Sequence, residues 1–461
     1  MLKRTDLHKY QEAGVDFIIK HKGCALLLEM GLGKSVTTLT AIADLIDDLD
    51  VERVLIIAPK KVAESTWAQE VAKWEHLKHL TVSVILGTAK QRTQAMQKDA
   101  DIYVTSRDNV VWLLEQDFTF DMLVLDELTS FKSSKAKRFK ALRKVRPLVK
   151  RCVGLTGTPT PNGLLDLWAQ MYLVDLGASL GRVKTKYIEA FFSTFMFQGG
   201  GCKYTLKKGA DKSIYKMIDK STLTMKAEDY LELPPMVERT IAVPLSEGVR
   251  AAYDAFEKEN VLQYVEETQD KPQNIVASSA AALCNKLCQF ANGAVYNEDR
   301  LPVEMHQEKL DMLIELIESA QVSGESVLVF YQYQHDCNRI KARPELKGLR
   351  VRKYEGDDDL KDWNLGKIDV LLTHAASTAY GLNLQKGGHI VIWYGTGWNA
   401  ELYLQGNARL HRQGQTQPTT IYRLVADATM DARALQAIDN KVSGQNAMLT
   451  ALTEVTRKYI K

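Results

Sequence analysis

Short apolar runs alternate with helical patterns in the first third of the chain. The helical patterns include residues 36–49 (VTTLTAIADLIDDL) and 65–74 (STWAQEVAKW). The apolar runs are residues 24–29, 54–59, 82–86, 101–106, 122–127 and 151–158. Buried strands that alternate with helices are typical of a parallel sheet covered by helices on both faces, so we predict an α/β fold.

The alternation stops near residue 160 and starts again near residue 326. Helical patterning dominates between these points, with a proline pair in LELPPM (231–236). The later apolar runs are residues 326–333, 349–356, 369–374, 389–395 and 419–426. A chain of 461 residues is too long for one small hydrophobic core, so we expect two α/β domains. The predicted boundaries are 1–235, with a helical extension from about 165, and 236–461, with a helical entry segment.

Composition is that of an ordinary soluble protein, with 45% hydrophobic and 25% charged residues. The chain contains no run of about 18 uncharged apolar residues, so no membrane span is expected. The first residues, MLKRTDLHKYQEAGVDF, lack the apolar core of a signal peptide, so we expect a cytoplasmic protein. Six cysteines are scattered, and Cys284 and Cys288 have no second pair to complete a zinc set. We predict buried free thiols.

The formal net charge of +3 is small, so any nucleic-acid contact must come from local patches. One such patch, residues 132–151 (KSSKAKRFKALRKVRPLVKR), holds ten Lys or Arg and no acid. A solvated helix and a phosphate-facing surface explain this run equally well on charge alone.

Residues 26–35 (LLLEMGLGKS) lead from an apolar run through glycines into a helical pattern. Gly31 and Gly33 allow a tight turn that brings N–H groups to phosphate oxygens, and Lys34 adds positive charge at a helix N-terminus. Ser35 offers a hydroxyl to Mg²⁺. Leu28 stands where the strict motif has its first glycine, and a glycine-rich turn with a chance lysine is the alternative.

Asp126 and Glu127 end the apolar run MLVLDE, at the edge of a parallel sheet where ligands bind. We predict that Asp126 holds Mg²⁺ and that Glu127 deprotonates the attacking water. A surface acidic pair is the alternative, which the phosphate-binding loop upstream disfavours. A third strand end, LTGTPTPNG (155–163), carries Thr156 and Thr158, which we predict sense the γ-phosphate; taken alone, an ordinary turn explains it better.

The order of these segments resembles a superfamily-two helicase motor, and more closely the Swi/Snf-like DNA-dependent ATPases. The segments are LHKYQEAGVDF, EMGLGKS, IIAPKKVAESTWAQEVAKW, VTSRDN, DELTSFK, LTGTPTPN, VLVFYQY, THAASTAYGLNLQ, WNAELYLQGNARLHRQGQ and YRLVADATMDARAL. Together they cover nearly the whole chain. The resemblance implies two RecA-like lobes, hydrolysis of ATP with Mg²⁺ in the cleft between them, and DNA as the partner.

The resemblance also implies roles for individual residues. Arg409 and Arg412 would stabilise charge on the γ-phosphate, with Gln405 one turn earlier on the same helix face. Gln11 would read adenine. The implied nucleotide-binding residues are Gln11, Met30, Gly31, Leu32, Gly33, Lys34, Ser35 and Gly381. The implied DNA-backbone contacts are Pro59, Lys60, Thr105, Ser106, Arg107, Lys132, Thr373 and Ser377. The implied coupling residues are Thr156, Gly157 and Thr158.

Some features depart from the family pattern. The acidic motif reads DELT rather than DEAH or DEGH, and residues 354–370 are shorter than the matching stretch and lack its arginine. The linker keeps Lys226 and the prolines but not the paired arginines. Trp67 and Trp74, seven residues apart, are predicted to pack in the core rather than stack on bases.

Three functions remain open. The first is a monomeric ATP-driven translocase on duplex DNA that binds the backbone without sequence preference and remodels DNA or protein–DNA complexes. The second is a strand-separating DNA or RNA helicase, for which the sequence shows no wedge. The third is a nucleotide-gated DNA-binding module of a larger assembly. A compact motor of this kind is expected in the cytoplasm of a bacterium or of a phage-infected host.

Overall fold

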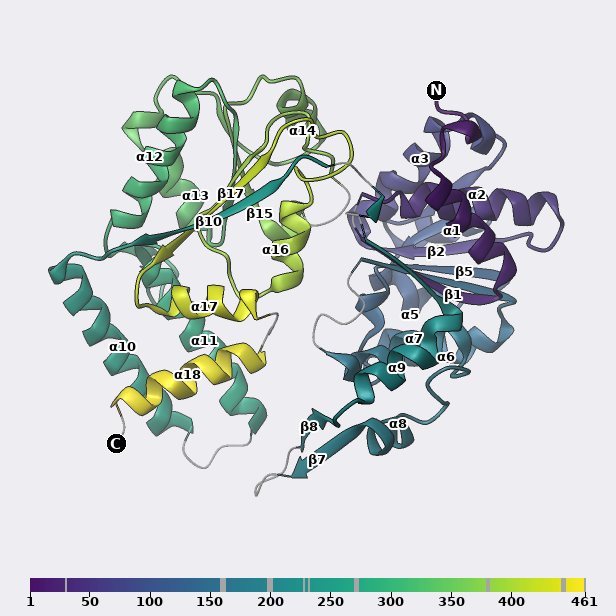
Figure 1. Ribbon diagram of the computed structural model, residues 1–461, viewed down its shortest axis with the longest axis horizontal. Coiled ribbons are helices and arrows are strands. Elements are labelled where there is room, and N and C mark those ends of the chain that lie inside the picture. Colours follow the sequence, from purple (N-terminus) through teal and green to yellow (C-terminus); the bar gives the residue numbers. More distant parts are fainter. Residues whose placement is uncertain are drawn as a thin grey trace. The chain divides into compact units, whose positions relative to one another are not determined.

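The computed structural model describes residues 1–29, 31–157, 163–196, 202–226, 229–230, 233–268, 273–378, 382–440 and 445–459. The chain forms two compact units (Figure 1). The first contains Met1–Met196 and Cys202–Glu232, and the second contains Leu233–Lys461. Within the described ranges, no helix has the length and apolar character that a membrane crossing requires.

Seven parallel strands form the main sheet of the first unit, as far as the structure describes it. They are β1 (Gly23–Leu28), β2 (Val54–Ala58), β3 (Val82–Ile85), β4 (Ile102–Ser106), β5 (Met122–Asp126), β6 (Arg151–Thr156) and β9 (Thr222–Met225). They lie in the order β3-β4-β2-β5-β6-β1-β9. All five residues of β2 are buried, which explains why the central strands read as continuous apolar runs.

Helices cover both faces of this sheet. They are α1 (Lys9–Lys20), α2 (Lys34–Asp47), α3 (Trp67–Lys73), α4 (Ala89–Met96), α5 (Val110–Leu113), α6 (Lys137–Val145), α7 (Leu167–Asp175), α8 (Lys184–Phe191) and α9 (Ala210–Ile218). Figure 1 shows α1, α2 and α3 on one side of the sheet and α5, α6 and α7 on the other. An antiparallel pair, β7 (Phe192–Met196) and β8 (Cys202–Leu206), follows α8.

The second unit has a six-stranded parallel sheet in its described residues. Its strands are β10 (Met236–Val243), β13 (Val327–Tyr331), β14 (Val351–Lys353), β15 (Val370–His374), β16 (Ile390–Trp393) and β17 (Thr419–Ala426), in the order β10-β17-β16-β13-β15-β14. The helices are α10 (Glu247–Thr268), α11 (Gln273–Ala291), α12 (Glu308–Val322), α13 (Gln334–Lys341), α14 (Asp357–Asn364), α15 (Ala375–Thr378), α16 (Ala400–Asn407), α17 (Met430–Asp439) and α18 (Gln445–Tyr459). A small antiparallel pair joins β11 (Ala294–Tyr296) to β12 (Pro302–Glu304).

The predicted α/β class is therefore confirmed, with two parallel sheets and helices around them. The structure also forms strands where helical patterning alone was expected. β9 pairs with β1 at the edge of the first sheet, and β10 pairs with β17 at the edge of the second. Most residues of β10 are exposed, so the strand lacks the apolar run that marks a central strand.

Two predictions about buried side chains are confirmed. Trp67 and Trp74 are both buried in the first unit. Cys284 and Cys288 are buried free thiols on α11. No cluster of metal-ligating side chains occurs among the residues that the structure describes.

A buried polar network ties α12 to its neighbours in the second unit. The Lys309 ammonium forms an ion pair with Asp431 at the start of α17, and both side chains are almost completely buried. Lys309 Nζ also donates to Asn292 Oδ1 at 2.8 Å, and Asn292 Nδ2 donates to Asp336 Oδ2 at 3.0 Å. Because burial of a charge costs free energy unless the charge is paired, each member of this network depends on the others.

Lys309→Met should therefore lower the free energy of unfolding of the second unit by about 3–5 kcal/mol, because it leaves Asp431 buried without its partner. Denaturant unfolding measured by circular dichroism tests this. The matched control is Lys367→Ala, which removes an exposed ion pair with Asp362 and should cost under about 1 kcal/mol. Equal effects of the two changes would contradict the role of the buried network.

Candidate active site

The predicted catalytic residues of the first unit lie at one edge of its sheet. β1, β6 and β5 are adjacent, parallel and in register, with Leu26 opposite Leu155 and Leu155 opposite Asp126. Parallel strands place all their carboxyl ends at the same edge, so the segments that follow these three strands converge there. The glycine loop, the acidic pair and Thr156 are thus neighbours.

The glycine loop turns directly into α2. Gly31 has φ 88° and Gly33 has φ 73°, a left-handed conformation that side chains other than glycine rarely adopt. A Cβ on Gly33 would also lie 2.2 Å from Gln11 Nε2, so a larger residue there would displace the Gln11 side chain from the loop. Leu32 is buried and Ser35 is half-buried in the first turn of α2. Met30 lies outside the described residues.

The Lys34 ammonium is held close to the strand that precedes it. Lys34 Nζ donates to the carbonyl oxygen of Leu28 at 2.8 Å and of Glu29 at 3.3 Å. This arrangement holds the positive charge over the loop, at the N-terminus of α2, where the helix dipole also favours an anion.

Gln11 packs against the same loop. Its side chain is buried, Oε1 accepts from the His8 N–H at 2.9 Å, and Nε2 donates to the Leu32 carbonyl at 3.4 Å. Gln11 therefore caps α1 and braces the phosphate-binding loop in this structure. Its implied contact with adenine stays a prediction.

Asp126 lies in a site that disfavours its charge. Desolvation raises the pKa of this carboxyl to about 6, although nearby Lys34 and two hydrogen bonds act in the opposite direction. The donors are Trp67 Nε1 to Oδ2 at 3.2 Å and the Glu127 N–H to Oδ1 at 3.1 Å. Asp126 is half-buried, so a ligand can still reach it.

Trp67 is a site residue that the sequence did not reveal. Its spacing from Trp74 predicted only a buried ring, and the ring is indeed buried. The segment that leads to it, Val62–Thr66, is a π-helical turn after β2, and β2 is the neighbour of β5. Irregular helical turns of this kind are frequent at functional sites, and here the turn brings an indole N–H to the catalytic edge.

Glu127 adopts φ 54° and ψ 65°, which is uncommon for a residue with a side chain. Strained backbone of this type costs roughly 1–3 kcal/mol and is concentrated at functional sites. Thr156 is buried at the end of β6, and Gly157 follows it. Thr158 lies outside the described residues.

The predicted DNA contacts of the first unit differ in accessibility. Lys60 is exposed, whereas Arg107 and Lys132 are half-buried. Arg107 Nη1 donates to Ser130 Oγ at 2.7 Å, which connects the end of β4 to the segment after the acidic pair.

Pro59, Thr105 and Ser106 are buried. Thr105 Oγ1 donates to the Ile85 carbonyl at 2.9 Å. The structure therefore does not place the Thr105 and Ser106 side chains where a backbone phosphate would reach them, because both complete the packing at a strand end.

The run 132–151 is not one solvated helix. Only its middle part forms α6, whose buried residues are Phe139, Leu142 and Val145. Arg146 is buried and donates to the carbonyls of three residues, and Arg151 is buried beside Asp50. The lysines and arginines that remain exposed are Lys135, Lys137, Lys140, Arg143, Lys144 and Lys150.

In the second unit, the two late arginines converge on one carbonyl. Arg409 Nη1 and Arg412 Nη1 donate to the Leu382 oxygen at 3.3 and 3.1 Å, and Arg409 Nε donates to the Gln405 oxygen at 3.0 Å. α16 ends at Asn407, so the expected helix face shared by Gln405 and the two arginines is wrong. They lie in the turns after the helix, which approach the chain at Leu382.

Other predicted residues of the second unit are less accessible. Gln405 is buried and donates to Glu401 Oε1 at 3.2 Å. Thr373 is buried at the end of β15, and Ser377 is half-buried in α15. The Thr373 side chain therefore does not lie on a surface that DNA could touch. Gly381 lies outside the described residues.

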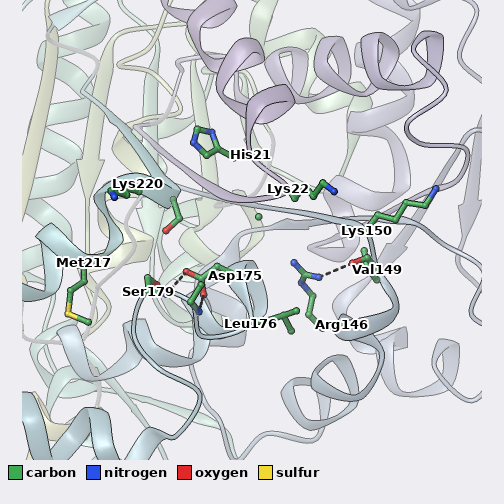
Figure 2. Close-up of a pocket in the computed structure, with 13 residues that line it drawn as sticks. His21, Lys22, Arg146, Val149, Lys150, Asp175, Leu176, Ser179, Met217 and Lys220 are labelled. Carbon is green, nitrogen blue, oxygen red and sulfur yellow. Dashed lines mark hydrogen bonds between the residues drawn. The ribbon is translucent and has the colours of Figure 1, made fainter.

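A cavity of about 480 Å³ lies at the opposite edge of the first sheet, where β1 begins at Gly23 (Figure 2). Figure 2 shows Lys22, Lys150 and Lys220 around it, with Asp175 and Arg146 between them. The Asp175 carboxylate accepts from the N–H groups of residues 177–179, and the Arg146 guanidinium binds carbonyls. Asp175 thus holds the loop after α7 and Arg146 holds the end of α7, both away from the catalytic edge.

Comparison with known proteins decides the family. The model of the SNF2-related domain matches residues 10–291, and the model of the helicase conserved C-terminal domain matches residues 308–414. The chain belongs to the SNF2-related family. The resemblance drawn from the motifs is therefore confirmed, and with it the prediction of an ATPase.

Three relatives of this SNF2-related ATPase illustrate its range. Putative protein p41 of Acyrthosiphon pisum secondary endosymbiont phage 1 is 34% identical, with 96% of this chain and 98% of that protein covered. The CHD3-type chromatin-remodeling factor CHR7 of Arabidopsis thaliana is 24% identical, with 95% and 37% covered. An uncharacterized ATP-dependent helicase of Mycoplasma genitalium, MG018, is 26% identical, with 95% and 42% covered. The chain thus spans about two-fifths of the last two.

The residues at the catalytic edge fit ATP and Mg²⁺ chemically. The narrow glycine loop presents the α2 N-terminus and Lys34 to phosphates. Ser35 and Asp126 offer two oxygen ligands, which suits Mg²⁺ because this ion commonly keeps several waters and binds substrate phosphates. Bound there, Mg²⁺ would neutralise charge on the phosphates.

The raised pKa of Asp126 predicts an acid limit for activity. The metal ligand must be ionised, so kcat/KM for ATP should fall as pH drops through about 6, where an ordinary aspartate would stay charged to about 4. Trp67→Phe removes a donor that stabilises the carboxylate. The pH at which kcat/KM falls on the acid side should then rise by on the order of one pH unit.

The measurement is kcat/KM for ATP against pH. Trp74→Phe is the matched control, because this buried indole donates to Glu70 rather than to Asp126. An acid limb that moves equally in both variants, or in neither, would contradict the role of Trp67.

Proposed function

We propose that this SNF2-related ATPase is a motor that translocates on double-stranded DNA and remodels DNA or protein–DNA complexes without separating the strands. The observation that carries the proposal is the convergence of Lys34, Asp126 and Glu127 at one edge of the sheet, where β1 and β5 flank β6. These are the charges that phosphoryl transfer to water requires. The relative CHR7 is named a chromatin-remodeling factor, which supports a DNA substrate.

In the proposed reaction, Glu127 accepts a proton from water, whose oxygen attacks the γ-phosphorus of ATP. The bond from this phosphorus to the bridging β-γ oxygen breaks, so that ADP and phosphate leave. Lys34 and the α2 N-terminus bind the β- and γ-phosphates, and Asp126 with Ser35 would hold the metal. We propose that Arg409 and Arg412 exchange the Leu382 carbonyl for the γ-phosphate oxygens and stabilise the developing charge.

Lys60, Arg107 and Lys132 are the proposed contacts to the DNA backbone in the first unit. All three follow the carboxyl ends of strands, and each retains some solvent exposure. Contacts to phosphates carry no base information, so binding is expected to be independent of sequence and to weaken as salt increases.

Steady-state ATPase rates without nucleic acid and with duplex DNA, single-stranded DNA and RNA test the proposal. We expect the strongest stimulation with duplex DNA. Glu127→Gln is the blank, because it keeps the side chain's size but cannot accept the proton. Equal rates under all four conditions would overturn the proposed DNA-dependent motor.

Arg412→Ala should lower kcat by about a thousandfold and leave nucleotide affinity nearly unchanged, because its charge acts on the transition state. Turnover and fluorescent-nucleotide binding are measured in parallel. Arg352→Ala is the control, since this exposed arginine pairs with Asp359 and Asp362 on the surface. A loss of affinity without a loss of kcat would assign Arg412 to ground-state binding instead.

A further inference from the structure

The antiparallel pair β7–β8 exposes large apolar side chains to solvent on both of its faces. Phe195 is 62% exposed, Met196 is 75% exposed and Tyr204 is 38% exposed. Met196 pairs with Cys202 and Thr194 pairs with Tyr204, so Met196 and Tyr204 share one face while Phe195 lies on the other. An isolated two-stranded pair gains little stability from such residues, which suggests that they serve an interaction.

The root of this pair is fixed to the first unit. Phe192 and Tyr187 are buried in its core, and the Lys207 N–H donates to the Phe191 carbonyl at 2.9 Å. The Lys207 ammonium donates to the Glu189 and Ala190 carbonyls at 2.6 and 3.2 Å, at the end of α8. The exposed part therefore extends from a rigid base, beyond α8 and α9 (Figure 1).

Positive charge is concentrated in the segment that contains the exposed side chains. Residues 182–220 contain nine Lys or Arg and three Asp or Glu, a larger excess than the net +3 of the whole chain. α9 buries Ala210, Ile214 and Ile218 and leaves its lysines and Tyr215 in solvent. The exposed lysines that follow β8 are Lys207, Lys208, Lys212, Lys216 and Lys220.

The positive surface also continues toward the catalytic edge. Lys184 Nζ, at the start of α8, donates to Ser134 Oγ at 3.1 Å, just after the acidic motif. Burial lowers the pKa of Lys184, the Asp166 carboxylate acts in the opposite direction, and nearby Lys135 lowers the pKa further. Lysines that gather in this way repel one another unless a polyanion approaches.

We propose that the β7–β8 pair and α9 bind unpaired nucleotides of a DNA strand, with bases against Phe195, Met196 and Tyr204 and phosphates against the α9 lysines. This inference rests on the proposed function and names its preferred substrate, DNA that carries a junction or an unpaired arm. The combination of exposed aromatic side chains with surrounding cations favours nucleic acid over a protein partner, because bases stack on rings while lysines bind the backbone.

The first test compares binding, without nucleotide, to a blunt duplex and to a fork with unpaired arms. Wild type should bind the fork about tenfold more tightly, a size typical of base stacking. The triple variant Phe195→Ala/Met196→Ala/Tyr204→Ala should lose that preference and keep duplex-stimulated ATPase. The matched control is Leu301→Ala/Val303→Ala at the β11–β12 pair, where both residues are exposed, and it should keep the preference.

The second test needs no change at the aromatic residues. Cys202 is exposed, whereas the other five cysteines are buried, so maleimide should modify this thiol selectively. Forked DNA should slow the modification at least about fivefold, and blunt duplex should not. Equal protection by both DNAs, or none, would overturn the proposal.

The outcomes separate the two proposals. Duplex-stimulated ATPase in a wild type without fork preference would overturn only the nucleotide-binding role of β7–β8 and leave a protein-docking surface as the alternative. Fork preference in a wild type whose ATPase ignores every nucleic acid would overturn the motor instead. Equal loss of fork and duplex binding in the triple variant would also contradict base stacking.

Discussion

The parallel pairing of β1, β6 and β5 is the constraint on which the catalytic edge depends. Parallel strands cannot be joined by tight turns, so each must be followed by a crossover that starts at the same edge. The register of the strands determines which residues lie side by side at this edge. Leu27 lies opposite Thr156, and Leu155 lies opposite Asp126. A glycine loop and an acidic pair separated by about ninety residues of chain therefore meet through backbone hydrogen bonds alone.

The sequence predicted best those features that depend on local pattern. The apolar runs predicted the central strands, and the glycine loop before Lys34 predicted a helix start, because both depend on neighbours in the chain. The sequence did not predict the edge strands β9 and β10. Their pairing partners, β1 and β17, lie far away in sequence. Neither strand contains a continuous apolar run that would have marked it as a strand.

The same distinction holds for the site. Asp126 ends β5 and Glu127 follows it, and this position at the end of a strand was predictable. Trp67 could not be assigned to Asp126, because the contact depends on a π-helical turn and on the adjacency of β2 and β5. A motif also does not report burial: Thr105 and Thr373 match positions of DNA contacts, yet their hydroxyls are enclosed at strand ends.

The Lys34 ammonium donates hydrogen bonds to two main-chain carbonyls, those of Leu28 and Glu29. Its ammonium is therefore already ordered before a phosphate arrives, and binding is an exchange of one set of oxygens for another. Ordering a lysine side chain from free rotation would cost up to about 2 kcal/mol. Because the Lys34 side chain is already ordered by these two hydrogen bonds, phosphate binding incurs less of this entropic penalty.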